Sequence, residues 1–104
     1  MKRLVVTADD FGASAQVNDA VLETHAHGIL TAASLMVGAP HAADAVARAH
    51  ATPTLRVGLH LVLVEGRPVL PPSQVPDLVD ASGHFRTDMA RAGAAMFFRP
   101  SVKR

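Results

Sequence analysis

Apolar and polar positions follow a regular pattern along the first half of the chain. Three short runs rich in apolar and β-branched residues, at 4–8, 31–37 and 56–63, are typical of buried strands. Between them, residues 15–27 and 41–50 place apolar side chains at helical spacing. Strands that alternate with helices at this pitch predict βαβ units and a parallel sheet. The fold class expected from the pattern is therefore α/β, with a βαβαβ order.

The same pattern predicts which side chains are buried. In the first helix, Val17 and Val21 mark the inner face, and we expect Asn18 and Asp19 to be more exposed. The third strand, 56–63, is almost entirely apolar, so we expect both its faces to be covered.

The regular pattern ends after residue 63. Glycine and proline interrupt the segment 65–80, which predicts a long irregular loop of the kind that often binds a ligand. Arg67 is the substrate-binding candidate, because of its placement in this loop.

His84 follows a Ser-Gly turn and is expected to be an exposed turn residue, although it could be recruited as a metal ligand. Pro100 is typical of the first residue of a further helix.

Composition narrows the class of protein. The chain has 104 residues, a formal net charge of +1 and 49% hydrophobic residues, which suits one small domain or part of a larger one. The near-neutral charge gives no support for a nucleic-acid partner. No apolar run approaches the ~20 residues of a membrane span, and the amino-terminal run is too short for a signal peptide. The absence of cysteine excludes disulfides and thiolate metal sites, and we expect a cytoplasmic location.

The candidate chemistry lies at the ends of the expected strands. Asp9 and Asp10 end the first strand, and parallel α/β folds bind ligands at the carboxyl ends of their strands. Two adjacent carboxylates repel unless a cation, a proton or solvent stabilises them. His60, in the third strand, is two strand spacings away in a 1-2-3 order, from where its side chain can lean toward the same ion. Aspartate and histidine are ordinary ligands of zinc and similar divalent metals, so one aspartate can hold the metal while the other accepts a proton from water.

Each of these residues has a simpler interpretation as well. An Asp-Asp pair can cap a helix and remain solvated, and a lone histidine in an apolar strand is more often a packed core residue. Two protein ligands are also too few for a catalytic zinc, which has three plus water. A phosphate-receiver domain would need an aspartate at the end of the third strand, where none occurs before Asp77, so that interpretation is poor.

Three motifs together resemble the amino-terminal half of the YdjC-like (ChbG/HpnK) carbohydrate deacetylase family. They are Thr7–Gly12 (TADDFG), Thr31–Val37 (TAASLMV) and Val57–Leu63 (VGLHLVL) with Gly66-Arg67-Pro68 after it. The segments 75–80 and 97–100 resemble its hopanoid biosynthesis-associated HpnK branch in particular. The resemblance runs over the whole chain, and the three motifs occur in the family's order.

The resemblance implies a distorted (β/α) barrel of the glycoside hydrolase/deacetylase type that binds one divalent metal ion, zinc or magnesium. Family members remove an acetyl group from N-acetylated sugars, and the HpnK branch implies an N-acetylglucosamine-bearing hopanoid glycolipid as substrate. By this resemblance Asp10 and His60 are metal ligands and Asp9 is the catalytic base. The family's second metal-binding histidine lies in a carboxyl-terminal segment that this sequence does not contain.

Residues 1–104 are accordingly expected to form a partial deacetylase domain without its carboxyl-terminal half. The edges of a three-stranded parallel sheet are open, which favours association, and we expect a homo-oligomer. The alternative is a catalytically incomplete fragment that acts only as a folded or oligomerising remnant of such an enzyme.

Overall fold

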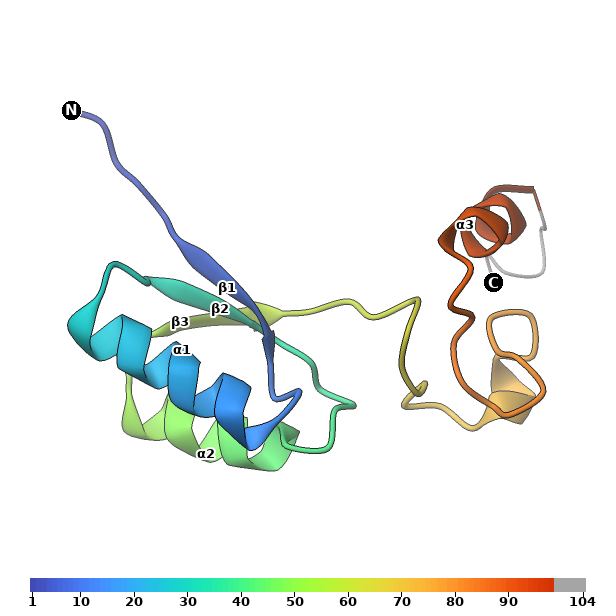
Figure 1. Cartoon of the computed structure of the whole chain (residues 1–104), viewed down its shortest axis with the longest axis horizontal. Coiled ribbons are helices and arrows are strands. Elements are labelled where there is room, and N and C mark those ends of the chain that lie inside the picture. The colour runs from blue at the N-terminus through green and yellow to red at the C-terminus, as the bar shows by residue number, and fades with distance from the viewer. Residues whose placement is uncertain (99–104) are drawn as a thin grey trace. The chain divides into compact units, whose positions relative to one another are not determined.

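The structure is a computed structural model that describes residues 1–98. The chain divides into two compact units, Met1–Leu61 and Val62–Arg104. The first unit contains a three-stranded parallel sheet of order β1-β2-β3, and both helices lie on one face of it (Figure 1). Its elements are β1 (Thr7–Phe11), α1 (Ala15–His27), β2 (Ala32–Leu35), α2 (Ala42–Ala51) and β3 (Arg56–Leu59). The predicted α/β class and parallel βαβαβ order are confirmed, and the barrel stays a prediction.

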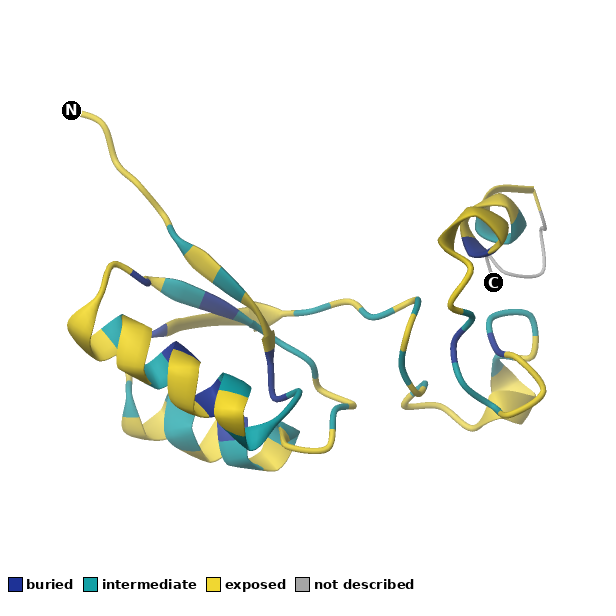
Figure 2. Ribbon diagram, viewed as in Figure 1, coloured by how far each residue is buried: buried dark blue, intermediate teal, exposed yellow. Residues whose placement is uncertain are grey.

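The core of the first unit lies between the sheet and the two helices. It is built mainly from aliphatic side chains around one phenylalanine, Phe11, which is fully buried at the end of β1 (Figure 2). Ala33 on β2 and Ala45 on α2 are also buried, and their small side chains let helix and sheet approach closely. The core cluster comprises Phe11, Val21, Leu30, Ala33, Ala45 and Leu55.

One polar residue, Asn18 of α1, is fully buried beside this core, so the prediction that it is exposed was wrong. Its Oδ1 accepts a 2.8 Å hydrogen bond from the backbone N–H of Gly12. Its Nδ2 donates to Asp44 Oδ2 at 2.8 Å and to the carbonyl of His41 at 3.2 Å. The amide therefore connects the turn after β1 with the amino-terminal end of α2, and its burial is balanced by these hydrogen bonds.

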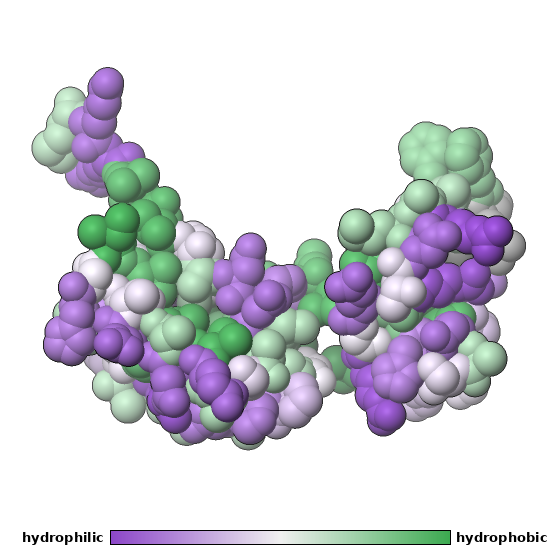
Figure 3. Space-filling view, viewed as in Figure 1, coloured by the Kyte–Doolittle hydropathy of each residue, from purple (hydrophilic) through white to green (hydrophobic). Residues whose placement is uncertain are grey.

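The prediction that both faces of the third strand are covered was also wrong for the described structure. All four residues of β3 are exposed, including Val57 at 40% and Leu59 at 61%. The reason is that both helices lie on one face and leave the other face of the sheet uncovered (Figure 1). Leu4 and Val5, ahead of β1, are exposed too, and Figure 3 shows the apolar surface along that segment.

The second unit has little regular structure before its last helix. A short 3-10 helix, η1 (Pro72–Gln74), is followed by an isolated antiparallel bridge between Val79 and Phe85, both of which are buried. The irregular loop expected over 65–80 therefore contains one turn of 3-10 helix.

The last described helix of the second unit is α3 (Met89–Phe98). Asp88 precedes it and accepts a 3.0 Å hydrogen bond from the backbone N–H of Arg91, which satisfies one of the free donors at the start of the helix. The helix predicted to begin at Pro100 lies outside the described residues. Among the helices within 1–98, none has the length and apolar character needed to cross a membrane.

The burial of Asn18 makes a prediction about stability. The substitution Asn18→Ala leaves the buried Gly12 N–H without its acceptor, and we expect the free energy of unfolding to fall by about 2 kcal/mol. Gln16→Ala, at an exposed position of the same helix, should change it by less than about 0.5 kcal/mol. Guanidinium unfolding followed by circular dichroism measures both values. Equal effects of the two substitutions would contradict a structural role for the amide.

The same network predicts how stability depends on pH. The hydrogen bond from Asn18, followed by that from Arg48, lowers the pKa of Asp44 below its ordinary range. A carboxyl group whose pKa is lower in the folded state stabilises the fold above its unfolded pKa, and the contribution is lost as the pH falls through the folded pKa. We therefore expect the Tm to decrease between about pH 5 and pH 2. Asp44→Asn should decrease this slope, and an unchanged slope would contradict the assignment.

Candidate functional site

The carboxyl ends of the three strands bring four polar side chains together. Asp9 and Asp10 lie near the end of β1, Ser34 lies on β2, and His60 follows the last residue of β3. Since β2 is the central strand, Ser34 stands between the two aspartates and the histidine. This is the edge at which a parallel sheet is expected to bind a ligand.

Four short distances define the cluster. Ser34 donates its hydroxyl proton to Asp9 Oδ1 at 2.8 Å, and the Ser34 oxygen lies 3.1 Å from His60 Nδ1. The backbone N–H of Asp10 donates to His60 Nδ1 at 3.3 Å, and Asp10 Oδ1 lies 3.6 Å from the same nitrogen. Because an amide N–H can only donate, the contact with Asp10 requires an unprotonated Nδ1. That is the form in which an imidazole nitrogen binds a metal.

The backbone of Asp10 explains how two consecutive carboxylates reach the same neighbours. In a regular strand they would point to opposite faces of the sheet. Asp10 has φ = 61°, in the left-handed region, and the β1–β2 register shifts between Ala8 and Phe11. Because of this irregularity, Asp9 accepts the hydrogen bond from Ser34 while the carboxylate of Asp10 approaches His60. A left-handed aspartate is uncommon, and such conformations cluster at functional sites.

The imidazole of His60 is less exposed to solvent than the carboxylate of Asp10. The His60 side chain is 25% exposed, whereas that of Asp10 is 60% exposed. The imidazole is thus held by its neighbours while the carboxylates remain accessible to a ligand and to water.

The donor atoms fit two positions around a divalent metal. Ligands at ~2.0–2.2 Å from a tetrahedral zinc lie about 3.3–3.6 Å apart, and the Asp10 Oδ1 to His60 Nδ1 distance is 3.6 Å. Within residues 1–98, however, no group of three or more His, Cys, Asp or Glu side chains is placed to hold an ion. Asp10 and His60 therefore fit a metal as part of a site that needs at least one more ligand.

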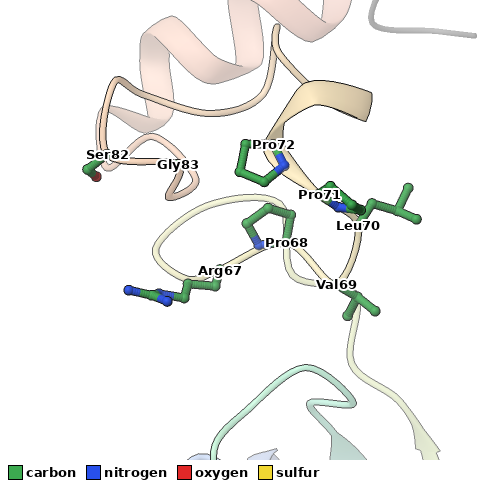
Figure 4. Close-up of a pocket in the computed structure, with 8 residues that line it drawn as sticks. All are labelled: Arg67, Pro68, Val69, Leu70, Pro71, Pro72, Ser82 and Gly83. Carbon is green, nitrogen blue, oxygen red and sulfur yellow. The ribbon is translucent and has the colours of Figure 1, made fainter.

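Arg67, the substrate-binding candidate, lies in the second unit, where its Nε donates to His84 Nε2 at 2.8 Å. His84 is half-buried, and its other ring nitrogen is 2.9 Å from Ser82 Oγ, so both nitrogens have protein partners. Arg67 also lines a pocket of that unit together with proline side chains (Figure 4). His84 is thus a hydrogen-bonded residue of the second unit rather than a free turn residue.

Sequence reasoning missed Ser34. Its neighbours Ala33 and Leu35 made the segment look like a uniformly apolar strand, and a serine is compatible with a strand interior. The available signal was its place near the carboxyl end of the central strand, between the two strands that carry the charged candidates.

Comparison with known proteins matches the chain to one family. The family model of YdjC-like proteins matches residues 3–104. A carbohydrate deacetylase of Brevibacillus brevis is 48% identical over 84 residues, which are 81% of this chain and 33% of that protein. A carbohydrate deacetylase of Geobacillus stearothermophilus is 44% identical over 91 residues, which are 86% of this chain and 36% of that protein.

A solved structure shares the fold as well. The crystal structure of an Enterococcus faecalis V583 protein named for cellobiose-phosphate cleavage matches with a TM-score of 0.77 and 34% identity. The match covers 81% of this chain and 33% of that protein. The chain spans about a third of the length of the curated relatives it matches. Its matched residues, its relatives and its fold together show that it belongs to the family of YdjC-like proteins.

Proposed function

We propose that this chain carries the metal-binding and proton-accepting part of the active site of a metal-dependent carbohydrate N-deacetylase. The observation that carries the proposal is the cluster in which Ser34 donates to Asp9 and lies 3.1 Å from His60 Nδ1, while Asp10 Oδ1 lies 3.6 Å from the same nitrogen. The carbohydrate deacetylases among its relatives support a sugar as the substrate.

The residues of the cluster divide into two roles. Asp10 and His60 would hold one divalent ion, zinc or magnesium. A divalent ion supplies Lewis-acid polarisation of the amide carbonyl and increases the acidity of a water molecule. Asp9 is the base. Its Oδ1 is held by Ser34, and its Oδ2 accepts no hydrogen bond from any residue within 1–98, which leaves that oxygen available to a water molecule.

The reaction follows from these positions. Asp9 accepts a proton from the attacking water, and the water oxygen bonds to the acetyl carbonyl carbon. The C–N bond of the amide then breaks, the proton passes from the Asp9 carboxyl group to the sugar nitrogen, and acetic acid and the free amino sugar leave, the acid then giving its proton to the amine or to water. The hydrogen bond from Ser34 orients the carboxylate for both transfers, and the exposure of the two aspartates permits access by a sugar.

The substrate and the barrel in this proposal rest on the sequence resemblance, whereas the location rests on the absence of cysteine, the oligomer on the open sheet edges, and the role of Arg67 on its place in the loop. The substrate is an N-acetylglucosamine-bearing hopanoid glycolipid, and the enzyme works in the cytoplasm as a homo-oligomer. The βαβαβ sheet is the first part of a distorted (β/α) barrel, of which the remaining part supplies the second histidine. Arg67 contacts the sugar from the loop that follows the third strand.

A second candidate is a catalytically incomplete remnant of such an enzyme. It is favoured by the absence, within residues 1–98, of a third side chain placed to complete the metal site. The open edges of β1 and β3 would then serve association alone. Metal binding by the chain itself separates the two candidates.

A zinc titration by calorimetry tests the metal centre. We expect about one ion per chain, with binding abolished by Asp10→Ala and by His60→Ala because each removes one of two protein ligands. Asp9→Asn should retain binding, since Asp9 is assigned to proton transfer. His27→Ala is the matched control, an exposed histidine at the end of α1. Absence of binding, or binding that neither ligand substitution changes, would favour the remnant.

Ser34 provides a second test of the same cluster. Ser34→Ala removes the hydroxyl that holds Asp9 Oδ1 and lies 3.1 Å from His60 Nδ1, and loss of a hydrogen bond to a charged group of the cluster, about 1.5 kcal/mol, should weaken metal binding by about tenfold. Ser34→Thr retains a hydroxyl and suits a strand, so it should restore most of the affinity. The titration used for the metal centre measures both variants. Equal affinities for Ser34→Ala and the unsubstituted chain would exclude this supporting role.

A further inference from the structure

The last helix of the second unit, α3, carries a single charged side chain, Arg91. Its inner side is marked by Ala92, which is buried, and by Ala95 and Met96, which are half-buried. The rest of the helix is exposed, as Figure 2 shows. A surface helix of a globular protein normally presents polar side chains to water, and α3 presents almost none.

Two rows of residues form the outer face of α3. Residues four apart lie on the same side of a helix, so 89, 93 and 97 form one row and 90, 94 and 98 form the other. All six are exposed and apolar: Met89, Ala90, Gly93, Ala94, Phe97 and Phe98. Apart from the helix itself, residues 1–98 place no atom within 4 Å of where a Cβ atom of Gly93 would lie. The middle of this outer face is therefore open.

The outer face ends in a pair of aromatic rings. The rings of Phe97 and Phe98 meet edge to face, with their centroids 5.0 Å apart and their planes at 78°. Their side chains are 71% and 77% exposed. Exposed apolar surface of this kind marks a contact with another protein or with a lipid surface.

The charge around the outer face has one sign. Arg91 borders the face, and its side chain is 84% exposed. Asp88, just before the helix, caps it and lies 3.7 Å from Arg91 Nε. From residue 89 onward the sequence contains no acidic side chain and four basic ones, which are Arg91, Arg99, Lys103 and Arg104. The helix and the sequence that follows it are thus apolar and positively charged.

This charge distinguishes between a second copy of the chain and a lipid surface. In a symmetric dimer the same patch meets itself, so the basic side chains of the two copies would come together without acidic partners. A bilayer with acidic headgroups attracts those side chains, and the cytoplasmic leaflet of a membrane is of this kind. A helix of ten residues is about 15 Å long, so it can lie in the surface of a bilayer but cannot cross it.

We propose that α3 is a membrane-surface helix, whose outer face enters the headgroup region of a bilayer containing acidic phospholipids. Buried apolar area and attraction to acidic lipids together give such helices their affinity. Long basic side chains beside the buried face extend to the headgroups. The inference rests on the proposed function for its purpose, because a hopanoid glycolipid substrate lies in a bilayer. The helix holds the chain at the surface from which that substrate is taken.

Fluorescence tests the insertion of α3. The chain contains no tryptophan and no tyrosine, so Phe98→Trp introduces a single reporter. With vesicles of equal parts phosphatidylcholine and phosphatidylglycerol, we expect its emission to shift to shorter wavelength and to be quenched by brominated lipid. Ile29→Trp is the matched control, because Ile29 is 74% exposed in the first unit, and it should show neither effect. No shift at residue 98, or equal shifts at both positions, would overturn the proposal.

Sedimentation with the same vesicles measures the affinity. Phe98→Ala should weaken binding by about ten- to a hundredfold, as expected for the loss of one buried phenylalanine side chain, whereas Ile29→Ala should leave it unchanged. Arg91→Gln should weaken binding by about fivefold, and Arg91→Lys, which keeps the charge, should not. Added salt should weaken binding. Equal binding to vesicles of phosphatidylcholine alone would overturn the role of the basic side chains.

A second copy on the outer face would give a different result. Phe98→Ala would then lower the oligomeric state measured by sedimentation velocity without lipid and leave vesicle binding unchanged, and this outcome would overturn the proposal. None of these measurements needs metal or substrate, so Asp10→Ala should bind vesicles like the unsubstituted chain. Failure of lipid binding and failure of the metal centre are therefore separate outcomes.

Discussion

The buried amide of Asn18 is the interaction on which the arrangement of the first unit depends. A carboxamide removed from water needs partners for its donors and its acceptor, and here they come from two different segments. The acceptor holds Gly12, just after β1, and the donors hold the start of α2 at His41 and Asp44. A single side chain thus fixes the exit of the first strand against the second helix.

The position of the candidate active site follows from that constraint. Gly12 has φ = 100°, and a Cβ atom there would lie 3.2 Å from the Cα of Ala42, so the turn is closed tightly against α2. Two residues earlier, Asp10 is left-handed as well. The chain therefore leaves β1 along one defined path, and the path sets which atoms of Asp10 face His60. The chemistry proposed for the cluster therefore depends on the packing of this turn against α2.

The sequence predicted the order of the elements because their signals are local, although β1 begins at Thr7 rather than at residue 4 and β3 ends at Leu59 rather than at residue 63. The helix expected over 15–27 is observed as Ala15–His27, and its cap at Ser14 accepts a hydrogen bond from Val17. The sequence also located the charged candidates at the ends of β1 and β3, because the alternation of side chains and the strand order determine which residues share an edge of the sheet.

Asn18 was misassigned because a hydrophobic pattern treats every amide as a surface group, whereas burial depends on partners that are distant in sequence. The link between Arg67 and His84 spans 17 residues of irregular chain and has no periodic signal. The faces of β3 could not be judged from its own residues, because coverage depends on what packs against them.

The left-handed backbone of Asp10 means that folding and function favour different residues at this position. Glycine adopts this conformation without the steric cost that a side chain carries, which is of order 1 kcal/mol, and aspartate retains it only because its surroundings hold it there. A variant selected for thermal stability alone would therefore tend to replace this aspartate, and would discard a carboxylate that faces the histidine. At residue 10, the side chain that suits the backbone and the side chain that carries a carboxylate are therefore different.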